Sequence, residues 1–388
     1  MSESENSSTL LLSAAHDVAA VAAAEATTAE ANRRLAPDVV KSFVVAGFPR
    51  HFVPAECGGT MGTFAELGQA VATLGTGCTA TAWCASLAAH TSRMAAHLPT
   101  AGYREIWADG PDALLVAALS PSGTAEPVPG GYRLSGTWPF VSAIDYADWG
   151  MLTALVPGDG EPEPRVLAVP RAAMRTVDTW RNMGMAATGS NMVIVEDVFV
   201  PEARTIARAD LFAGRAKDSA APCHSVPMQA TTMMFADPVL GAAKGALRGW
   251  LDHVTPKIRA AANQPRQALP GMPTFNRTSH DVTLARAGTE IEAAELLLGR
   301  AAATADAPPI TPYETMRNWR DVAVATDMLV GVANRLLRAV GTSGQATGHP
   351  VQRFWRDINS VAGHQALQVE SAAIAFSHQV IDDREESR

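Results

Sequence analysis

The sequence predicts an α+β protein that is mostly helical, with a small β domain between two helical parts. Three observations predict it. Apolar residues recur at helical spacing through the first third of the chain. Short apolar runs separated by Pro and Gly follow, and long amphipathic stretches with short breaks fill the remainder. We therefore expect an N-terminal helical domain over residues 1–112, a central β-barrel over 113–215 and a C-terminal four-helix bundle over 216–388.

Helical spacing in the N-terminal part predicts four helical stretches, over residues 10–45, 64–74, 79–98 and 102–108. Pro37 fits a helix start and Gly47 fits a helix stop. The stretch 79–98 is apolar nearly all round, so we expect it to be buried.

The central part carries short runs with strand composition, which predict strands over residues 114–119, 132–134, 149–156, 165–169 and 192–200. Gly130-Gly131 indicates a hairpin between two of them. In the last part we expect helices over 235–255, 281–305, 312–340 and 350–382, with a Pro- and Gly-rich crossover at 264–279.

Composition limits the function classes. The chain has 388 residues with 47% hydrophobic and 18% charged residues, and a net charge of −8. That charge disfavours nucleic acid or an anionic membrane as the main partner. The opening residues lack a signal-peptide pattern and we expect no membrane-spanning run, so a cytoplasmic protein is predicted. The four cysteines lack metal-ligand spacing, which predicts reduced thiols and no metal: Cys57, Cys78, Cys84 and Cys223.

The stretch Leu134-Ser-Gly-Thr-Trp-Pro-Phe-Val-Ser142 is the most informative local motif. A strand that delivers Trp138, Pro139 and Ser142 to one place can form a wall and a hydrogen-bonding group for a flat aromatic cofactor. His364, more than 200 residues later, can add a titratable group if the fold brings it there. No GxGxxG motif follows a predicted strand, so a dinucleotide fold of that type is not indicated.

Four further motifs occur in a fixed order: Arg181-Asn-Met-Gly-Met185, Ala187-Thr-Gly-Ser190, Val195-Glu-Asp-Val-Phe-Val-Pro201 and Gln352-Arg-Phe-Trp-Arg-Asp357. Together they resemble the acyl-CoA dehydrogenase superfamily. The 138–142 segment is similar to the Trp-x-Phe-x-Ser pattern of that superfamily's flavin-dependent two-component monooxygenases. The resemblance implies reduced FAD or FMN from a separate NAD(P)H flavin reductase, O2 as co-substrate and a C4a-hydroperoxyflavin. It also implies a small aromatic or natural-product substrate and a homotetramer.

The resemblance also implies roles for three catalytic candidates. Ser142 would hold the flavin N5 by a hydrogen bond, and His364 would hydrogen-bond or help protonate the peroxide. His90 lies in the all-apolar stretch 79–98, and related hydroxylases carry a histidine on the equivalent helix that faces the substrate. The structural alternatives are a turn serine and histidines that are satisfied within a helical core.

Several positions share an implied role as cofactor contacts: Trp138, Pro139, Ser142, Ser120, Thr188, Ser190, Arg266 and Gly341. Ser120 lies where the superfamily places flavin or substrate contacts. Arg266 and the loop that begins at Gly341 would reach the nucleotide part of the flavin, the former from a neighbouring subunit. Hydroxyl residues at such places also cap turns, and short Gly loops are common.

Three other functions stay open beside hydroxylation. An acyl-CoA dehydrogenase would need a base, and the position where many members carry Glu is Gln365, which cannot act as one. A base elsewhere and tightly bound oxidised FAD would favour that reading. N-oxygenation of an amino sugar is the alternative within the monooxygenases. A flavin-binding protein without turnover would bind reduced flavin without forming the peroxide.

Overall fold

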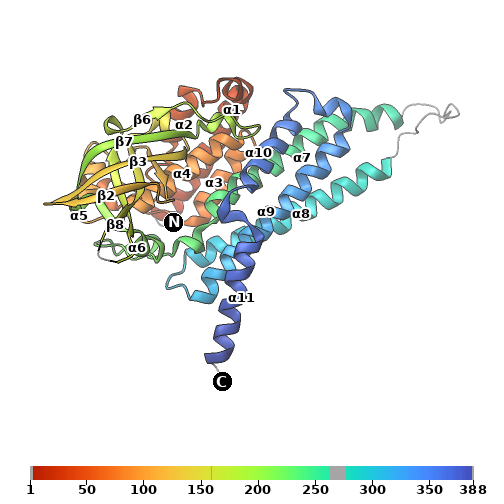
Figure 1. Cartoon of the computed structure of the whole chain (residues 1–388). Coiled ribbons are helices and arrows are strands. Elements are labelled where there is room, and N and C mark those ends of the chain that lie inside the picture. Colours follow the sequence, from red (N-terminus) through yellow and green to blue (C-terminus); the bar gives the residue numbers. More distant parts are fainter. Residues whose placement is uncertain (1–2, 159, 263–276, 387–388) are drawn as a thin grey trace.

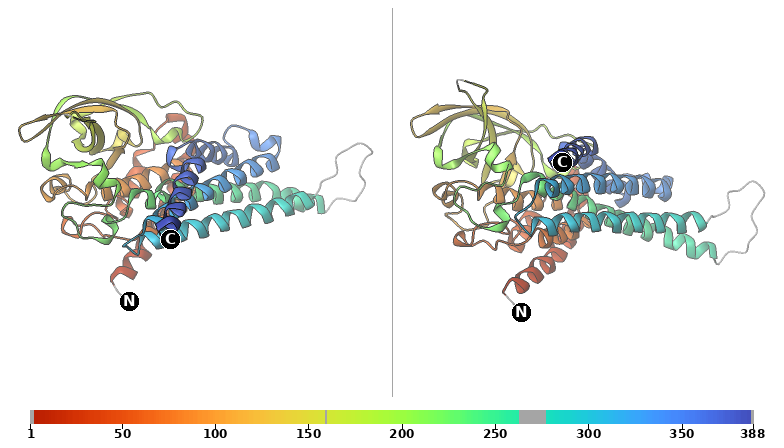
Figure 2. Two further views of the ribbon diagram at one scale, coloured as in Figure 1. Left: turned by 60° about the horizontal axis from the view of Figure 1, so that its bottom comes forward. Right: turned by 90° about the horizontal axis from the view of Figure 1, so that it is seen from below.

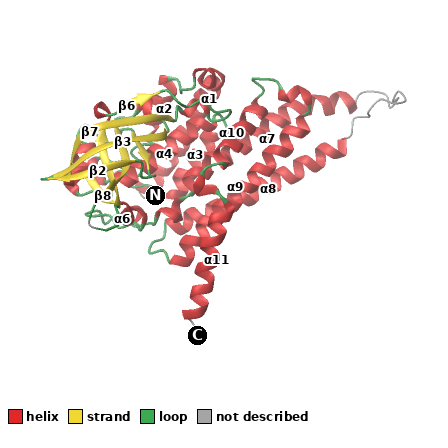
Figure 3. Cartoon of the chain, viewed as in Figure 1, coloured by secondary structure: helices red, strands yellow, loops and turns green. Residues whose placement is uncertain are grey.

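The computed structural model describes residues 3–158, 160–262 and 277–386. Figure 1 shows the strands gathered at one end of the molecule, the first helices behind them, and the C-terminal helices as a long arm. The colouring in Figure 3 shows that helix dominates and that the strands form one compact group. The mostly helical α+β class that the sequence predicts is therefore confirmed.

The N-terminal helices are α1 (Glu3–Asn32), α2 (Pro37–Ala46), α3 (Phe64–Gly75), α4 (Thr79–Ala95) and α5 (Thr100–Ile106). The predicted stretch 10–45 is two helices, because α2 begins at Pro37 and Gly47 follows it with a φ of 99°. Such left-handed backbone favours glycine. A capping box between Thr63 and Glu66 starts α3.

Helix α4 is buried, as its all-round apolar pattern predicts. Nearly all of its side chains are buried, and it packs against α3, α7 (Met233–Ala262) and β1 (Leu115–Ala118). Its buried Arg93 donates hydrogen bonds to the carbonyls of Cys223 and Val226. Burial lowers the pKa of Arg93 to about 10, so the group stays cationic and organises the chain segment that leads into α7.

The strands are β1, β2 (Gly123–Val128), β3 (Gly131–Val141), β4 (Trp149–Val156), β5 (Glu163–Pro170), β6 (Arg175–Val177), β7 (Asn191–Pro201) and β8 (Thr205–Ala207). They pair in the order β6-β7-β3-β2-β4-β5-β8, and β1 pairs with β4 in parallel. In the part of the chain that the structure describes, β6 and β8 end this order and do not pair. The predicted closed barrel is therefore wrong: the sheet is open, and its two end strands have three residues each.

After the short helix α6 (Arg208–Phe212), the bundle is built from α7, α8 (Arg277–Ala305), α9 (Pro312–Val340) and α10 (Pro350–Ala362), followed by α11 (Val369–Glu386). The predicted last helix, 350–382, is two helices with a break that holds His364. Both views in Figure 2 show the bundle extending past the sheet, with α11 at an angle to it. One continuous hydrophobic cluster joins the N-terminal helices to the bundle.

One helix in the described ranges passes a test of length and hydropathy for a membrane span, the stretch Leu10–Asn32 of α1. Our sequence prediction assigned no such stretch. One face of it packs into the core, through small side chains that include Ala15, Ala22 and Ala26. These residues give α1 the close contact with α3 that a core helix makes.

Asp237 on α7 is a buried carboxyl that faces Gly68 of α3, where a Cβ would lie 3.0 Å from Oδ2. Burial raises its pKa to about 8. The folded state therefore retains a proton that the unfolded state releases near pH 4, so stability is lost as the pH rises from about 4 to 8. We expect Asp237→Asn to raise the unfolding free energy at pH 8 by about 2–4 kcal/mol.

Urea unfolding of wild type and Asp237→Asn at pH 5 and pH 8 checks this expectation. The gap between the two proteins should widen towards pH 8. Equal gaps at both values would show that the carboxyl is not held protonated.

Candidate active site

Ser142 follows strand β3 at a point where the backbone leaves regular geometry. The pairing of β3 with β7 shifts register between Trp138 and Val141. Phe140 and Ala143 have φ values of 63° and 59°, which side-chain-bearing residues rarely adopt. Such strained backbone persists where the surroundings fix it, and it often marks a functional site. Here it turns the partly exposed Ser142 away from the sheet and towards α4.

Ser142 and His364 meet at one indole. Trp83 of α4 donates a hydrogen bond from Nε1 to Ser142 Oγ at 3.0 Å. The ring centroid of Trp83 lies 5.8 Å from that of His364 in an edge-on arrangement. Phe235 of α7 completes the group, with its ring centroid 4.1 Å from His364 and 5.4 Å from Trp83. The structure thus brings together the two groups that the sequence placed far apart.

A row of hydroxyl groups extends from Ser142 into the protein. Ser142 Oγ lies 2.7 Å from Ser190 Oγ, which lies 2.6 Å from Thr188 Oγ1. Thr188 donates to the carbonyl oxygen of Met185 at 2.8 Å. Ser190 and Thr188 are both buried. The two turn residues predicted as flavin contacts therefore contact Ser142 directly or through one hydroxyl.

The Arg356-Asp357 pair of α10 holds this turn in place. The Asp357 carboxylate accepts a hydrogen bond from the Met185 backbone N–H at 2.6 Å. Arg356 donates to the carbonyl of Met183 at 2.6 Å and pairs with Glu30 of α1. A Cβ at Gly184 would lie 2.2 Å from the Arg356 carbonyl, so glycine permits this close approach. Burial raises the pKa of Asp357 to about 6.

The two candidate histidines are both held neutral. His364 caps the short helix η9 (Gln365–Leu367) by accepting from the Ala366 N–H, and burial lowers its pKa to about 4. His90 packs against Phe52 and Phe64, with ring centroids at 5.4 and 5.9 Å, and burial lowers its pKa well below the usual value. Its Nδ1 has no hydrogen-bond partner within the described ranges.

Trp138 is placed differently from the prediction. Its indole is fully buried in the sheet core, donates to the Thr153 carbonyl at 2.7 Å and packs over Gly123 and Gly136. A ring in that place has no free face for a cofactor wall. Two residues later Phe140 is 71% exposed, and its ring centroid lies 6.1 Å from that of Trp180.

Other predicted contacts lie apart from Ser142. Pro139 is exposed on β3, and Ser120 is exposed beyond the end of β1. Gly341 ends α9 in the bundle, with a φ of 75°. Arg266 falls outside the described residues. Within the described part of the chain, no three His, Cys, Asp or Glu side chains are grouped to hold a metal.

Trp83 was missed from sequence, because an aromatic residue in an apolar stretch indicates core packing and gives no sign of chemistry. Phe140 was noted only as part of the 138–142 motif, and Phe235 only as part of a predicted helix, so neither was given a role of its own. The one available signal was that Trp83 and His90 are seven residues apart and so lie on the same face of α4.

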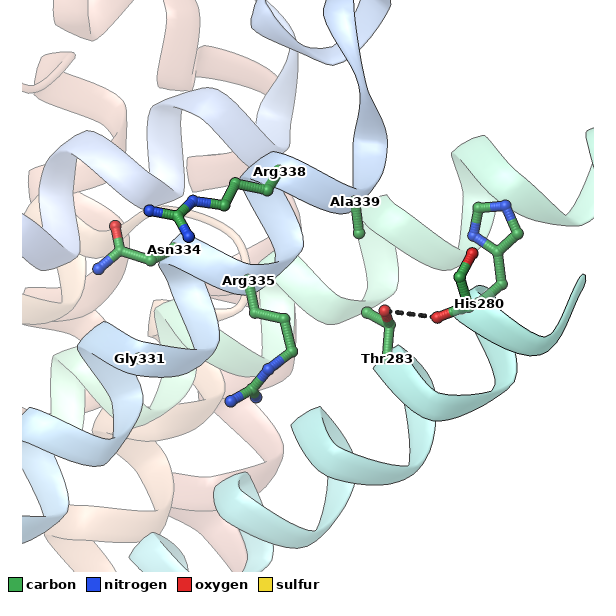
Figure 4. Close-up of a pocket in the computed structure, with 8 residues that line it drawn as sticks. His280, Thr283, Gly331, Asn334, Arg335, Arg338 and Ala339 are labelled. Carbon is green, nitrogen blue, oxygen red and sulfur yellow. Dashed lines mark hydrogen bonds between the residues drawn. The ribbon is translucent and has the colours of Figure 1, made fainter. Parts of the chain in front are cut away.

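Two cavities differ in size and in the side chains that line them. A small cavity beside Ser142 is closed by apolar side chains that include Leu35, Phe43 and Leu87. A hollow of about 620 Å³ lies between α8 and α9, lined by Thr283, Asn334, Arg335 and Arg338 among others. Figure 4 shows these side chains on the bundle helices. None of the residues that line this larger hollow belongs to the Ser142 group.

Comparisons with known proteins agree on one family. Residues 233–369 match the family model described as acyl-CoA dehydrogenase, C-terminal domain. The chain is 30% identical over 356 residues to the flavin-dependent monooxygenase oxygenase subunit HsaA of Rhodococcus jostii, covering 89% of this chain and 91% of that protein. This chain belongs to the flavin-dependent monooxygenases with the acyl-CoA dehydrogenase fold. The chain is therefore an enzyme. The monooxygenase branch of the acyl-CoA dehydrogenase superfamily, which the motifs predict, is confirmed.

Two further members of this monooxygenase family extend the comparison. An FADH2-dependent resorcinol hydroxylase, oxygenase component, from Rhizobium is 31% identical over 331 residues, covering 81% of this chain and 80% of that protein. The solved structure of XiaF from Streptomyces in complex with FADH2 and glycerol has a TM-score of 0.85 and 27% identity, covering 98% of this chain and 97% of XiaF. These comparisons support a reduced flavin as the cofactor, as the sequence motifs predict.

His364 gives a prediction on stability. Its folded pKa, about 4, lies below the usual value near 6.5, so the neutral ring is favoured by folding. The contribution is complete above pH 6.5 and is lost as the pH falls from 6.5 to 4. Allowing for partial exposure, we expect a loss of about 1–2 kcal/mol over this range in wild type.

His364→Asn keeps a side-chain acceptor for the Ala366 N–H and removes the titrating group. Thermal unfolding between pH 4 and 7 should show a shallower pH dependence for this variant. A His364 NMR titration with a midpoint above pH 6 would contradict the expectation.

Proposed function

We propose that this chain is the oxygenase component that hydroxylates a small aromatic substrate with O2 and reduced flavin. One observation carries the proposal: Ser142 and His364 share the Trp83 indole at the junction of sheet and bundle. A reduced flavin supplies two electrons and activates O2, so that one oxygen atom enters the substrate as hydroxyl and the other leaves as water. The chain's own groups must hold the ring and control protons.

The residues present fit a planar aromatic group. Phe140 is exposed beside Ser142 and edge-on to Trp180, and an exposed aromatic side chain on strained backbone is a natural platform for a flat ring. We propose that Phe140, in place of Trp138, forms the wall. Ser142 would hold N5 of the ring. Reduced FAD is proposed as the flavin, because XiaF binds FADH2.

Two neutral histidines suit the substrate side. His364 keeps Nε2 free of the cap that Nδ1 makes, so it can accept or return a proton there. His90 Nδ1 is buried without a partner, and a phenol hydroxyl that reached it would satisfy it. Ser120 and Pro139 stay proposed as outer contacts and Gly341 as a contact to the nucleotide part. An aromatic substrate is proposed because the resorcinol hydroxylase takes one.

Dehydrogenation of a thioester is the less supported alternative. Gln365 occupies the first turn of η9, and an amide cannot remove an α-proton. Within the described residues, no carboxylate hydrogen-bonds to Trp83, Ser142 or His364. We also propose a separate NAD(P)H reductase as the source of reduced flavin and the cytoplasm as the place of work.

The direct test supplies chemically reduced FAD, O2 and a panel that runs from resorcinol to multi-ring phenols. Wild type should form hydroxylated product in proportion to the flavin oxidised. Ser142→Ala should release H2O2 in place of product, with coupling lower by about tenfold, the effect of one hydrogen bond at the reacting group. His364→Asn should slow hydroxylation by about 10²–10⁴.

Ser135→Ala is a matched control, since Ser135 lies on the same strand and its hydroxyl accepts from the Asp197 N–H away from Trp83. It should keep the wild-type coupling. Oxidation of reduced FAD without product for every phenol tested, together with an unchanged rate in Ser142→Ala, would refute the proposed reaction.

We propose a homotetramer as the working assembly. Large aliphatic side chains are exposed on the bundle, with Leu296 of α8 at 75% and Ile374 of α11 at 59% exposure. Such side chains scattered on the bundle arm and on the angled α11 offer surface for another copy. The tetramer implied by the resemblance uses this part of the fold.

Light scattering on the purified chain should give about four times the 40.8 kDa protomer mass. Leu296→Glu together with Ile374→Glu should shift it to smaller species, because charges would be buried at the contact. A monomer in wild type at micromolar concentration would contradict the proposal.

A further inference from the structure

The row of hydroxyl groups behind Ser142 has a fixed direction. The Met185 carbonyl oxygen carries no proton, so its 2.8 Å contact with Thr188 Oγ1 requires the proton of Thr188. Without that proton, oxygen lone pairs would face each other at close range. A hydroxyl has one proton to donate, so Thr188 has none left for Ser190.

The direction then passes outward to Ser142. Because Thr188 can act towards Ser190 as an acceptor alone, Ser190 donates across their 2.6 Å contact. Ser190 has then used its proton, so Ser142 donates across the 2.7 Å contact to Ser190. Trp83 Nε1 can donate and cannot accept, and it occupies one lone pair of Ser142 at 3.0 Å. Ser142 is left with one free lone pair and no free proton.

The hydrogen-bonded hydroxyls of Thr188, Ser190 and Ser142 form a relay with one direction. We propose that this relay makes Ser142 a hydrogen-bond acceptor and thereby selects reduced over oxidised flavin. The inference rests on the proposed function, in which Ser142 faces N5. N5 of a reduced flavin carries a proton and can donate it to Ser142. N5 of an oxidised flavin is itself an acceptor and would meet a second acceptor. Ser190, Thr188 and Trp83 act through Ser142 as positioning residues.

The surroundings keep the direction from reversing. Thr188 is 2% and Ser190 4% exposed, so water cannot supply a substitute proton or acceptor. Met185, which begins the relay, has a φ of 56° and is anchored by its N–H to Asp357 at 2.6 Å. A relay fixed at one end by a carbonyl and covered along its length presents the same face to every ligand.

Two substitutions release the Ser142 proton by different routes. In Thr188→Val, Ser190 loses its acceptor and can donate to Ser142, which turns the Ser142 proton towards the ligand. In Ser190→Ala, Ser142 loses its acceptor directly. The readout is the reduction potential of bound FAD, obtained by anaerobic spectroelectrochemistry, with separate titrations of FADH2 and FAD. We expect the preference for FADH2 over FAD to fall about tenfold in both, the effect of one mismatched pair.

For a two-electron couple, a tenfold loss of preference lowers the potential by about 30 mV. Thr188→Ser keeps the hydroxyl and should restore the wild-type potential. Thr326→Val is a matched control, because the Thr326 hydroxyl is buried in α9 and donates to the Val322 carbonyl at 2.9 Å. It should leave the potential unchanged. If Thr188→Val does not fold, the single variants Ser190→Ala and Thr188→Ser are compared instead: the first should lower the potential and the second should keep it.

Ser142→Ala distinguishes a failure of the hydroxyl relay from a failure of the proposed flavin placement. This variant should show a lower preference for FADH2 over FAD. A wild-type preference in Ser142→Ala would mean that Ser142 does not face N5, and it would overturn the proposed placement of the flavin. A lowered preference in Ser142→Ala with a wild-type potential in both Thr188→Val and Ser190→Ala would overturn the relay and leave the proposed function standing.

Discussion

The hydrogen bond from the Met185 N–H to Asp357 is the constraint on which the site depends. It ties a turn of the sheet region to α10 of the bundle, beside the hydrogen bond from Arg356 to the Met183 carbonyl. Because Met185 also offers its carbonyl to Thr188 and to the Trp180 indole, one residue fixes both the hydroxyl row and the half-buried ring that packs against Phe140. Loss of this anchor would move both together.

The site combines aromatic rings, hydroxyls and neutral imidazoles, and its chemistry follows from that composition. A neutral His364 and an accepting Ser142 neither attract counter-ions nor bring charge-bound water to the reacting place. That environment suits a transfer of oxygen that water would abort. It does not suit removal of a carbon-bound proton, which needs a charged or strongly basic group such as the Glu that Gln365 replaces.

The sequence predicts those features that depend on local patterns. The helix predicted over 312–340 coincides with α9, because the Thr311–Glu314 capping box and Gly341 mark its ends. Strand β4 was predicted with its observed bounds, 149–156. The break before α11 was missed, since Gly363 in a right-handed helical conformation carries no stop signal by itself. The sheet's open edges were missed because β6 and β8 are too short to alternate.

The assignment of Trp138 failed for a related physical reason. Alternation along a strand puts residues 138, 140 and 142 on one face, which predicts that Trp138 and Ser142 point together. The positive φ of Phe140 breaks that alternation, and no sequence pattern at a non-glycine residue announces it. Trp83 was equally hidden, because its partners Ser142 and His364 come from distant elements.

The break between α10 and α11 explains why His364 can be both precise and neutral. Its Nδ1 accepts a hydrogen bond from the Ala366 N–H. Two further bonds hold the same loop: the Gln368 side-chain amide donates to the Ala362 carbonyl at 2.8 Å, and the Trp319 indole donates to the Ala366 carbonyl at 2.7 Å. The ring is thus fixed from its own loop and from α9, while Phe235 covers one face. Ser142 is fixed as firmly by the hydroxyl row and Trp83. Because both groups are positioned before any ligand arrives, binding need not order them, and preorganisation of that kind is what oxygen transfer at a sheltered ring requires.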